Sequence, residues 1–168
     1  MIIQNLKRLL SFLPKNFQQF LKMQHYKRLI KNGRFDAGET EYDELEKWVN
    51  KGDWVLDIGA NIGQYTHKLS KLVGKQGRVL AFEPIPDTFK ILSTNMLQVQ
   101  YHNITLMNVA VSNTTGVVRM EIPLHDTHLL NYYMAKITDE IAENQDAVMS
   151  ISIDNLNLVN KISLIKMD

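Results

Sequence analysis

The sequence of 168 residues contains no cysteine. Disulfide bonds, zinc–thiolate centres, iron–sulfur clusters and cysteine nucleophiles are therefore excluded. Long apolar runs are also missing, because the longest uncharged apolar cluster near the start is LLSFL at residues 9–13. That cluster is far shorter than the roughly 18 residues of a membrane span, and it is too short for the apolar core of a signal peptide. These absences favour a cytoplasmic location.

Acidic residues are missing from the first 35 positions, which hold eight Lys or Arg residues. The remainder has eleven bases against eighteen acids, a charge of −7, so the net charge of +1 hides a basic arm on an acidic body. Apolar residues recur at helical spacing over 2–13 and again over 16–30. We expect these helices to pack on the chain's own domain. Contact with an anionic membrane surface or polymer is the alternative, with no specific nucleic acid indicated.

Beyond residue 37, strand-like and helix-like segments alternate. Helices are expected over 38–53, 64–74 and 87–97, the last opened by an Asp87 cap. Strands are expected over 54–59, 77–84, 104–111, 117–122, 147–156 and 161–168. The inward residues of the first helix are Tyr42, Leu45, Trp48 and Val49.

The strand segments are rich in Val, Ile and Leu on both faces and are separated by helices. This pattern predicts an α/β fold with a Rossmann-like, doubly wound parallel sheet and helices on both sides. We therefore expect a helical arm over 1–37 and a ligand-binding domain over 38–168. The stretch 123–147 has no clear pattern and stays unassigned between a lid, a short helix and a loop.

The stretch DIGANIG, residues 57–63, lies between the first strand and the following helix. In an open parallel sheet, ligands bind at this place, where the strand order reverses. Gly59 and Gly63 allow a tight turn and close packing. Asn61 stands where the dinucleotide fingerprint needs glycine, and no Gly-Lys-Ser/Thr follows for a phosphate loop. The loop therefore favours a nucleoside ligand without a pyrophosphate or triphosphate.

Two acids support this interpretation. Glu83 follows the second strand, 24 residues after Gly59, where such folds place a carboxylate that accepts the ribose hydroxyls. Asp57 ends the first strand, and two carboxylates attract a ligand with an amino group and a sulfonium. S-adenosylmethionine has those groups. In the alternative interpretation Asp57 caps the helix and Glu83 is a solvated strand end. A nicotinamide-dependent oxidoreductase is disfavoured by Asn61.

These motifs resemble the FkbM-type methyltransferases, a branch of the class I S-adenosylmethionine-dependent enzymes. The resemblance runs through GDWVLDIGANIGQYT, GRVLAFEPIPDTFKIL, NVAVSNTTG, SISIDNL and SLIKMD. It implies S-adenosylmethionine as cofactor and methyl transfer to a hydroxyl oxygen, on a sugar, a polysaccharide precursor or a secondary metabolite.

The resemblance also implies roles for single residues. Four would surround the methionine moiety: Asp57, Gly59, Asn61 and Gly63. Glu83 would bind the ribose, Pro84 and Ile85 would lie along the adenine, and Asn108 to Ala110 would lie at its edge. Asp168 matches an aspartate beside the methyl acceptor and is the candidate catalytic base.

The family continues beyond the position of Asp168 into a Glu-Gly pair and further strands, whereas this sequence stops there. We therefore expect a sheet without its last strands, which leaves a parallel strand at an open edge. A catalytically inactive cofactor-binding fragment is the corresponding alternative, and association into a homo-oligomer is left open.

The histidines offer little for catalysis or metal binding. His125, Asp126 and His128 cluster in the unpatterned stretch, but a loop cluster without a further clear ligand does not predict a metal site. His67 is expected on a half-exposed face of the helix over 64–74. No G-x-S-x-G elbow is present, so a serine hydrolase is disfavoured.

Overall fold

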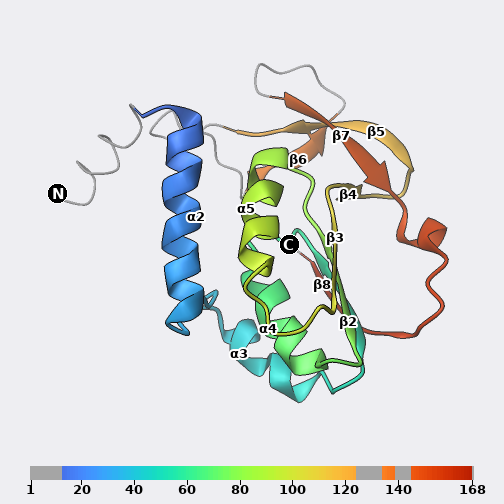
Figure 1. Ribbon diagram of the computed structural model, residues 1–168. Helices are drawn as coiled ribbons and strands as arrows, with labels where there is room; N and C mark the ends of the chain where they lie inside the picture. Colours follow the sequence, from blue (N-terminus) through green and yellow to red (C-terminus); the bar gives the residue numbers. More distant parts are fainter. Residues whose placement is uncertain (1–12, 124–133, 139–144, 168) are drawn as a thin grey trace. The chain divides into compact units, whose positions relative to one another are not determined.

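The computed structural model describes residues 13–123, 134–138 and 145–167 (Figure 1). The predicted helix over 2–13 and the cluster of His125, Asp126 and His128 lie outside these residues, except for Leu13. The chain divides into two compact units, Met1–Phe35 and Asp36–Asp168. In the part of the chain that the structure describes, no helix combines the length and the apolar character needed to cross a membrane.

The first unit contains α2 (Lys15–Lys31), which confirms the helix predicted over 16–30. Pro14 precedes it, and the Pro14 carbonyl accepts hydrogen bonds from the N–H groups of Phe17 and Gln18. The last turn carries Arg28 and Lys31, which interact favourably with the negative end of the helix dipole. None of the residues of α2 is buried.

The second unit begins with a short helix, α3 (Thr40–Glu44), which continues as the 3-10 turn η1 (Leu45–Lys47). The helix expected over 38–53 is therefore much shorter than predicted. Tyr42, Leu45 and Val49 are buried as expected, but Trp48 is 49% exposed. The inward placement of Trp48 was wrong because the helix ends at Lys47 and the indole lines an open pocket instead of the core.

The main sheet is parallel and has the strand order β3-β2-β1-β8. Its strands are β1 (Trp54–Ile58), β2 (Arg78–Phe82), β3 (Ile104–Met107) and β8 (Ile162–Met167). The chain builds outward from β1 to β3 and then returns to the other side of β1 with β8. The strand order therefore reverses at β1, which confirms the predicted parallel sheet and places its switch point at the carboxyl end of β1.

One face of this sheet packs against α4 (Gln64–Val73), whose Leu69 and Val73 meet Val55 and Val79. On the other face, Leu56, Leu80 and Phe82 pack against apolar residues from the segment 151–162, which includes the 3-10 turn η3 (Ile153–Leu156). Along the chain, α5 (Pro86–Met96) connects β2 to β3. Asp87 lies in its first turn and Ile85 is the N-cap, so the predicted Asp87 cap was wrong; Pro86 already occupies the first helical position.

A second, mixed sheet was not predicted. Its order is β4-β7-β5-β6, from the strands β4 (Ala110–Val111), β5 (Gly116–Glu121), β6 (Lys136–Thr138) and β7 (Gln145–Ile151). The single strand expected over 104–111 is therefore two strands in two sheets. The chain changes sheet at Asn108, whose side-chain amide donates to the carbonyls of Glu83 (2.8 Å) and Pro84 (2.9 Å) instead of continuing a ladder.

Candidate functional site

The loop of residues 59–63 connects β1 to α4 at the switch point of the parallel sheet. Three of its residues have left-handed backbone conformations: Gly59 (φ 74°), Asn61 (φ 50°) and Gly63 (φ 93°). Asparagine is one of the few residues with a side chain that adopts this region readily. Asn61 can therefore stand in the middle of a turn where the dinucleotide fingerprint has glycine.

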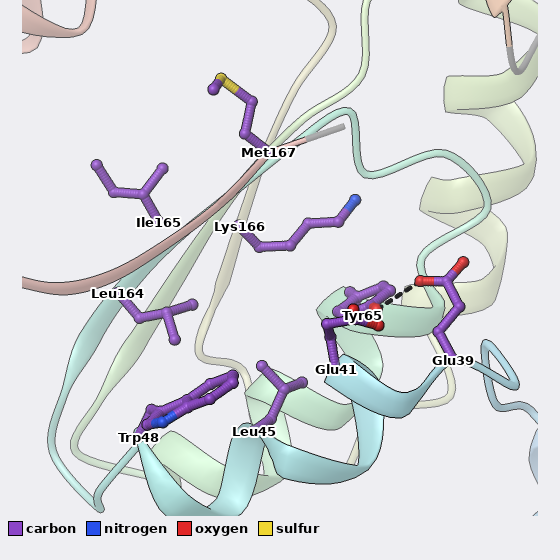
Figure 2. Close-up of a pocket in the computed structure, with 9 residues that line it drawn as sticks. All are labelled: Glu39, Glu41, Leu45, Trp48, Tyr65, Leu164, Ile165, Lys166 and Met167. Atoms are coloured by element: carbon purple, nitrogen blue, oxygen red, sulfur yellow. Dashed lines mark hydrogen bonds between the residues drawn. The ribbon is translucent and has the colours of Figure 1, made fainter.

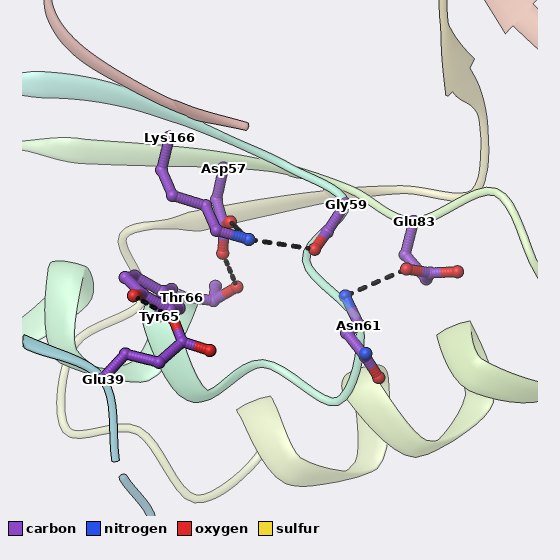
Figure 3. A network of polar contacts seen from close by, with 8 residues as sticks. All are labelled: Glu39, Asp57, Gly59, Asn61, Tyr65, Thr66, Glu83 and Lys166. Carbon is purple, nitrogen blue, oxygen red and sulfur yellow. Dashed lines mark hydrogen bonds and ion pairs between the residues drawn. The ribbon is translucent and has the colours of Figure 1, made fainter. Parts of the chain in front are cut away.

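Three side chains from other elements hold this loop. Lys166 on β8 donates to the Gly59 carbonyl (3.3 Å), and the Glu83 carboxylate accepts from the Asn61 N–H (2.9 Å). Figure 3 shows these two contacts approaching the loop from opposite sides. Asn95 on α5 donates from its amide to the Ile62 carbonyl (2.8 Å). The loop backbone is thus fixed by side chains at three of its five residues.

Gly63 fits closely against α5. A Cβ atom at this position would lie 2.6 Å from Leu92 Cδ1 and 2.7 Å from Met96 Cε, which is closer than side-chain carbons approach. Its φ of 93° also disfavours any residue with a side chain. The backbone conformation therefore favours glycine at position 63, and any larger residue would also require Leu92 and Met96 to shift.

Asp57 is completely buried at the end of β1. The Thr66 hydroxyl on α4 donates to its Oδ2 atom (2.5 Å), and the Lys166 Nζ lies 3.6 Å from its Oδ1 atom. Asp57 and Lys166 are paired in the parallel register of β1 and β8, which explains why the two side chains meet. Asp57 thus has a hydroxyl donor at one oxygen and an ammonium group near the other.

Lys166 was not singled out in the sequence, although it joins several parts of the site. Its side chain is 12% exposed, and its Nζ lies 4.8 Å from the centre of the Tyr65 ring, a cation–π contact. The Tyr65 hydroxyl donates in turn to Glu39 Oε2 (2.6 Å). The available signal was a lysine within a mainly apolar strand, because an ammonium group with little exposure needs a charged or polar partner.

Glu83 is the second buried carboxylate, with 5% of the residue exposed. Its Oε1 atom accepts from the Ile85 N–H (2.9 Å) and its Oε2 atom from the Asn61 N–H (2.9 Å). Burial raises the pKa of this carboxyl, against the opposing effect of the two backbone hydrogen bonds. The interpretation of Glu83 as a solvated strand end is therefore wrong.

The other residues predicted to bind the ligand divide into two groups. Pro84 and Asn108 lie at the strand ends beside Glu83, joined by the Asn108 amide. Ile85 and Ala110 are only 1% and 2% exposed, and they pack in an apolar cluster with Met120 and Val148 of the second sheet and with Ile122, which directly follows β5. The structure thus brings Pro84 and Asn108 to the site, while the side chains of Ile85 and Ala110 lie in the core behind it.

His67 is buried, with 5% exposed, so the expected half-exposed position was wrong. It follows the loop by one turn of α4 and faces inward with Thr66 and Ser70. Burial, with a smaller effect of Lys71, lowers its pKa to about 4, and the imidazole is therefore neutral at neutral pH. Asp168 lies outside the described residues. Within the described ranges, no group of three or more His, Cys, Asp or Glu side chains forms a metal site.

A pocket of about 430 Å³ runs beside the edge strand β8 (Figure 2). Its walls combine apolar side chains with polar groups at one end, where Lys166 and Tyr65 belong to the network described above. The nine lining residues are Glu39, Glu41, Leu45, Trp48, Tyr65, Leu164, Ile165, Lys166 and Met167.

Comparison with known proteins gives a family match. The methyltransferase FkbM domain matches residues 57–168. The ribosomal RNA large subunit methyltransferase E of Bdellovibrio bacteriovorus is 32% identical over 89 residues, which are 51% of this chain and 45% of that protein. The protein-L-isoaspartate O-methyltransferase of Methanococcus maripaludis is 29% identical over 65 residues, which are 39% of this chain and 30% of that protein.

Among solved structures, a SAM-dependent methyltransferase from Aquifex aeolicus shares 25% identity with this chain. The match covers 61% of this chain and 50% of that one, with a TM-score of 0.38. The chain spans less than half the length of these two curated relatives.

Proposed function

The chain belongs to the FkbM family of S-adenosylmethionine-dependent methyltransferases, and we propose that it binds S-adenosylmethionine at the carboxyl ends of β1 and β2. We further propose that the methyl group goes to a hydroxyl oxygen of a sugar, a polysaccharide precursor or a secondary metabolite. The chain spans less than half the length of these curated relatives, so the methyl-transfer reaction as a whole is proposed for it.

The observation that carries the proposal is the state of Glu83. Each of its carboxylate oxygens accepts one hydrogen bond from the chain's own backbone. A carboxylate oxygen has two lone pairs, so each oxygen keeps one for a further donor. The two neighbouring hydroxyls of a ribose are two such donors. The group therefore fits a ribose, and its desolvation makes each added hydrogen bond stronger than in water.

The neighbouring groups fit the rest of a nucleoside cofactor. The left-handed loop of residues 59–63 brings backbone close to the ligand's place, where Gly59 has no side chain in the way. Pro84 and Asn108 lie beside Glu83, joined to it through the Asn108 amide, and we place the adenine next to them. We propose that the loop borders the methionine moiety and that Pro84, Asn108 and the backbone of Ile85 and Ala110 border the base.

The cofactor would supply an activated methyl group on a sulfonium, and the acceptor oxygen would displace the neutral thioether in line. Such a transfer depends mainly on holding the two reactants in line. The chain's residues would then contribute by positioning the cofactor: the loop of residues 59–63 is held in place, and Glu83 anchors the ribose. A hydroxyl acceptor also has to lose its proton, and we propose Asp168, which directly follows β8, as the base.

Two further candidates compete with this function. One is a chain that binds the cofactor without catalysing methyl transfer. A nicotinamide-dependent oxidoreductase is disfavoured because Asn61 replaces the glycine at which a pyrophosphate approaches the backbone.

Titration calorimetry with S-adenosylmethionine, S-adenosylhomocysteine and NAD separates these candidates. We expect saturable binding of the first two ligands and none of NAD. Binding of NAD alone would show that the proposed cofactor is wrong. Binding without turnover on a panel of hydroxylated acceptors would favour the non-catalytic chain.

The role of Glu83 is tested with Glu83→Ala in the same titrations. The loss of two charged hydrogen bonds should weaken cofactor binding by about 2 kcal/mol or more. Asp154→Ala is the matched control, because Asp154 is an exposed carboxylate on η3. Equal affinities of wild-type protein and Glu83→Ala would contradict the ribose assignment.

A further inference from the structure

The cation at the end of β8 reaches both the first acidic residue of the motif and the loop that follows it. Lys166 Nζ lies 3.6 Å from Asp57 Oδ1 and donates to the Gly59 carbonyl at 3.3 Å. Figure 3 shows the ammonium group between these two partners. One side chain thus connects β8, β1 and the first residue of the loop.

Asp57 is fully buried and its other oxygen accepts from Thr66. A buried carboxylate without a compensating charge is strongly unfavourable, and Lys166 places a positive charge beside Asp57. Conversely, Lys166 is held in position by Asp57 and by the face of the Tyr65 ring, and it is thereby directed at the Gly59 carbonyl.

We propose that Asp57 and Lys166 are a positioning pair: Asp57 orients Lys166, and Lys166 fixes the Gly59 carbonyl and with it the loop that borders the cofactor. This assigns Asp57 an indirect role, whereas the family resemblance placed it against the methionine moiety. Asp57 has an ion-pair partner inside the protein, and Glu83 is the carboxylate that we place against the ligand. The proposal rests on the proposed cofactor.

The geometry also explains why β8 matters for the loop. The Gly59 residue has a left-handed conformation, and its N–H and that of Ala60 both donate to the Phe82 carbonyl. These bonds fix the start of the loop from the side of β2. Lys166 supplies the opposing contact from the side of β8. Without that contact the Gly59 peptide is held from one side only.

The experiment compares four variants with the wild-type chain: Lys166→Met, Lys166→Arg, Asp57→Asn and the double variant Asp57→Asn with Lys166→Met. Binding of S-adenosylmethionine is measured by calorimetry, unfolding by urea titration, and exchange of the amides of residues 59–63 by mass spectrometry without ligand. Lys161→Met is the matched control, since Lys161 is an exposed lysine directly before β8.

We expect Lys166→Met to weaken cofactor binding at least tenfold and to speed amide exchange in the loop, because a charged hydrogen bond to Gly59 is lost. Lys166→Arg keeps a charged donor and should restore most of the affinity. The double variant removes both buried charges and should recover resistance to urea, yet its affinity and loop exchange should stay as poor as in Lys166→Met. A merely structural pair would recover all three together.

Two results would overturn the proposal. One is wild-type affinity in Lys166→Met, and the other is a double variant that regains affinity and loop protection along with stability. If wild-type protein itself bound no S-adenosylmethionine, the proposed cofactor would be wrong and the positioning role with it. The two failures are therefore told apart by the wild-type titration alone.

Discussion

The ends of β1 and β2 each carry one buried carboxylate, and the two are stabilised in different ways. Asp57 has a hydroxyl donor and a lysine beside it, whereas Glu83 has two backbone N–H donors and a raised pKa. Asp57 therefore acts on the loop through its partner Lys166, which donates to the Gly59 carbonyl. A desolvated carboxylate that keeps free lone pairs is ready for a ligand. The same residue class therefore has different roles at neighbouring strand ends.

The largest effect is expected when the compensation of Asp57 is removed. Lys166→Met should lower the free energy of unfolding by about 3–5 kcal/mol, because it leaves an uncompensated charge in the interior. Urea unfolding followed by circular dichroism measures this change. Lys161→Met should leave the midpoint unchanged. A loss below about 1 kcal/mol would mean that Asp57 is not ionised in the folded protein.

A smaller loss of stability is expected when the Thr66 hydroxyl, which donates to Asp57, is removed. Thr66→Val keeps the shape of the side chain but removes the donor to Asp57 Oδ2, so unfolding should become easier by about 1.5–3 kcal/mol. Thr94→Val is the control, since the Thr94 hydroxyl donates to the Lys90 carbonyl within its own helix and does not reach Asp57. Equal effects of both substitutions would argue against a special bond to Asp57.

At the end of β2, a substitution of Glu83 is expected to change stability little and cofactor affinity more. Glu83→Gln relieves the desolvation of a charge but leaves one backbone N–H facing an amide group, so the two changes partly cancel. The free energy of unfolding should shift by less than about 1 kcal/mol, the scale of one net hydrogen bond, while cofactor affinity falls. A stability loss as large as that of Lys166→Met would remove the distinction between the two carboxylates.

The smallest effect is a difference in pH dependence. Because burial raises the pKa of Glu83, the folded chain binds a proton there at pH values where the unfolded chain has lost it. Its contribution to stability should therefore fall as pH rises from the ordinary value of 4.5 towards the raised pKa, and cofactor affinity should rise over the same range. Urea titrations and calorimetry of wild-type protein and Glu83→Gln, taken as differences, measure both trends.

His67 also makes stability depend on pH. Wild-type protein and Glu83→Gln share this contribution, so it cancels in the difference between them. The lowered pKa of His67 means that the unfolded chain binds its proton first as pH falls below 6.5. The stability that comes from the neutral His67 is fully present above pH 6.5 and is lost as the pH falls towards about 4. This trend is opposite in sign to the effect of Glu83. A difference between the two proteins with the sign of His67 would contradict the assignment to Glu83.

Short sequence patterns predicted those parts of the site that depend only on residues close together in the chain. The strands before and after α4, the turn at residues 59–63 and the place of Glu83 all follow from short motifs with fixed spacing. The burial of Glu83 favours the functional interpretation over a solvated strand end. Asn61 also shows why a departure from the glycine pattern does not disturb the turn.

Contacts between distant segments were beyond local patterns. The partner of Asp57 depends on the register between β1 and β8, which no spacing within either strand reveals. The second sheet forms through antiparallel pairing of β5 with β7 across an unpatterned stretch, and Asn108 turns the chain out of the first sheet. Trp48 and His67 were misplaced because their exposure depends on which elements lie over them.

The bond between Lys166 and Gly59 joins residues 107 positions apart. During synthesis, the chain has to extend through β8 before this contact can close, so a nascent chain that already contains the whole motif at 57–63 still lacks one of the three side chains that hold it. Contacts of such separation are slow to form because the intervening chain must first be ordered. The loop is therefore held by all three side chains only after β8 has been synthesised.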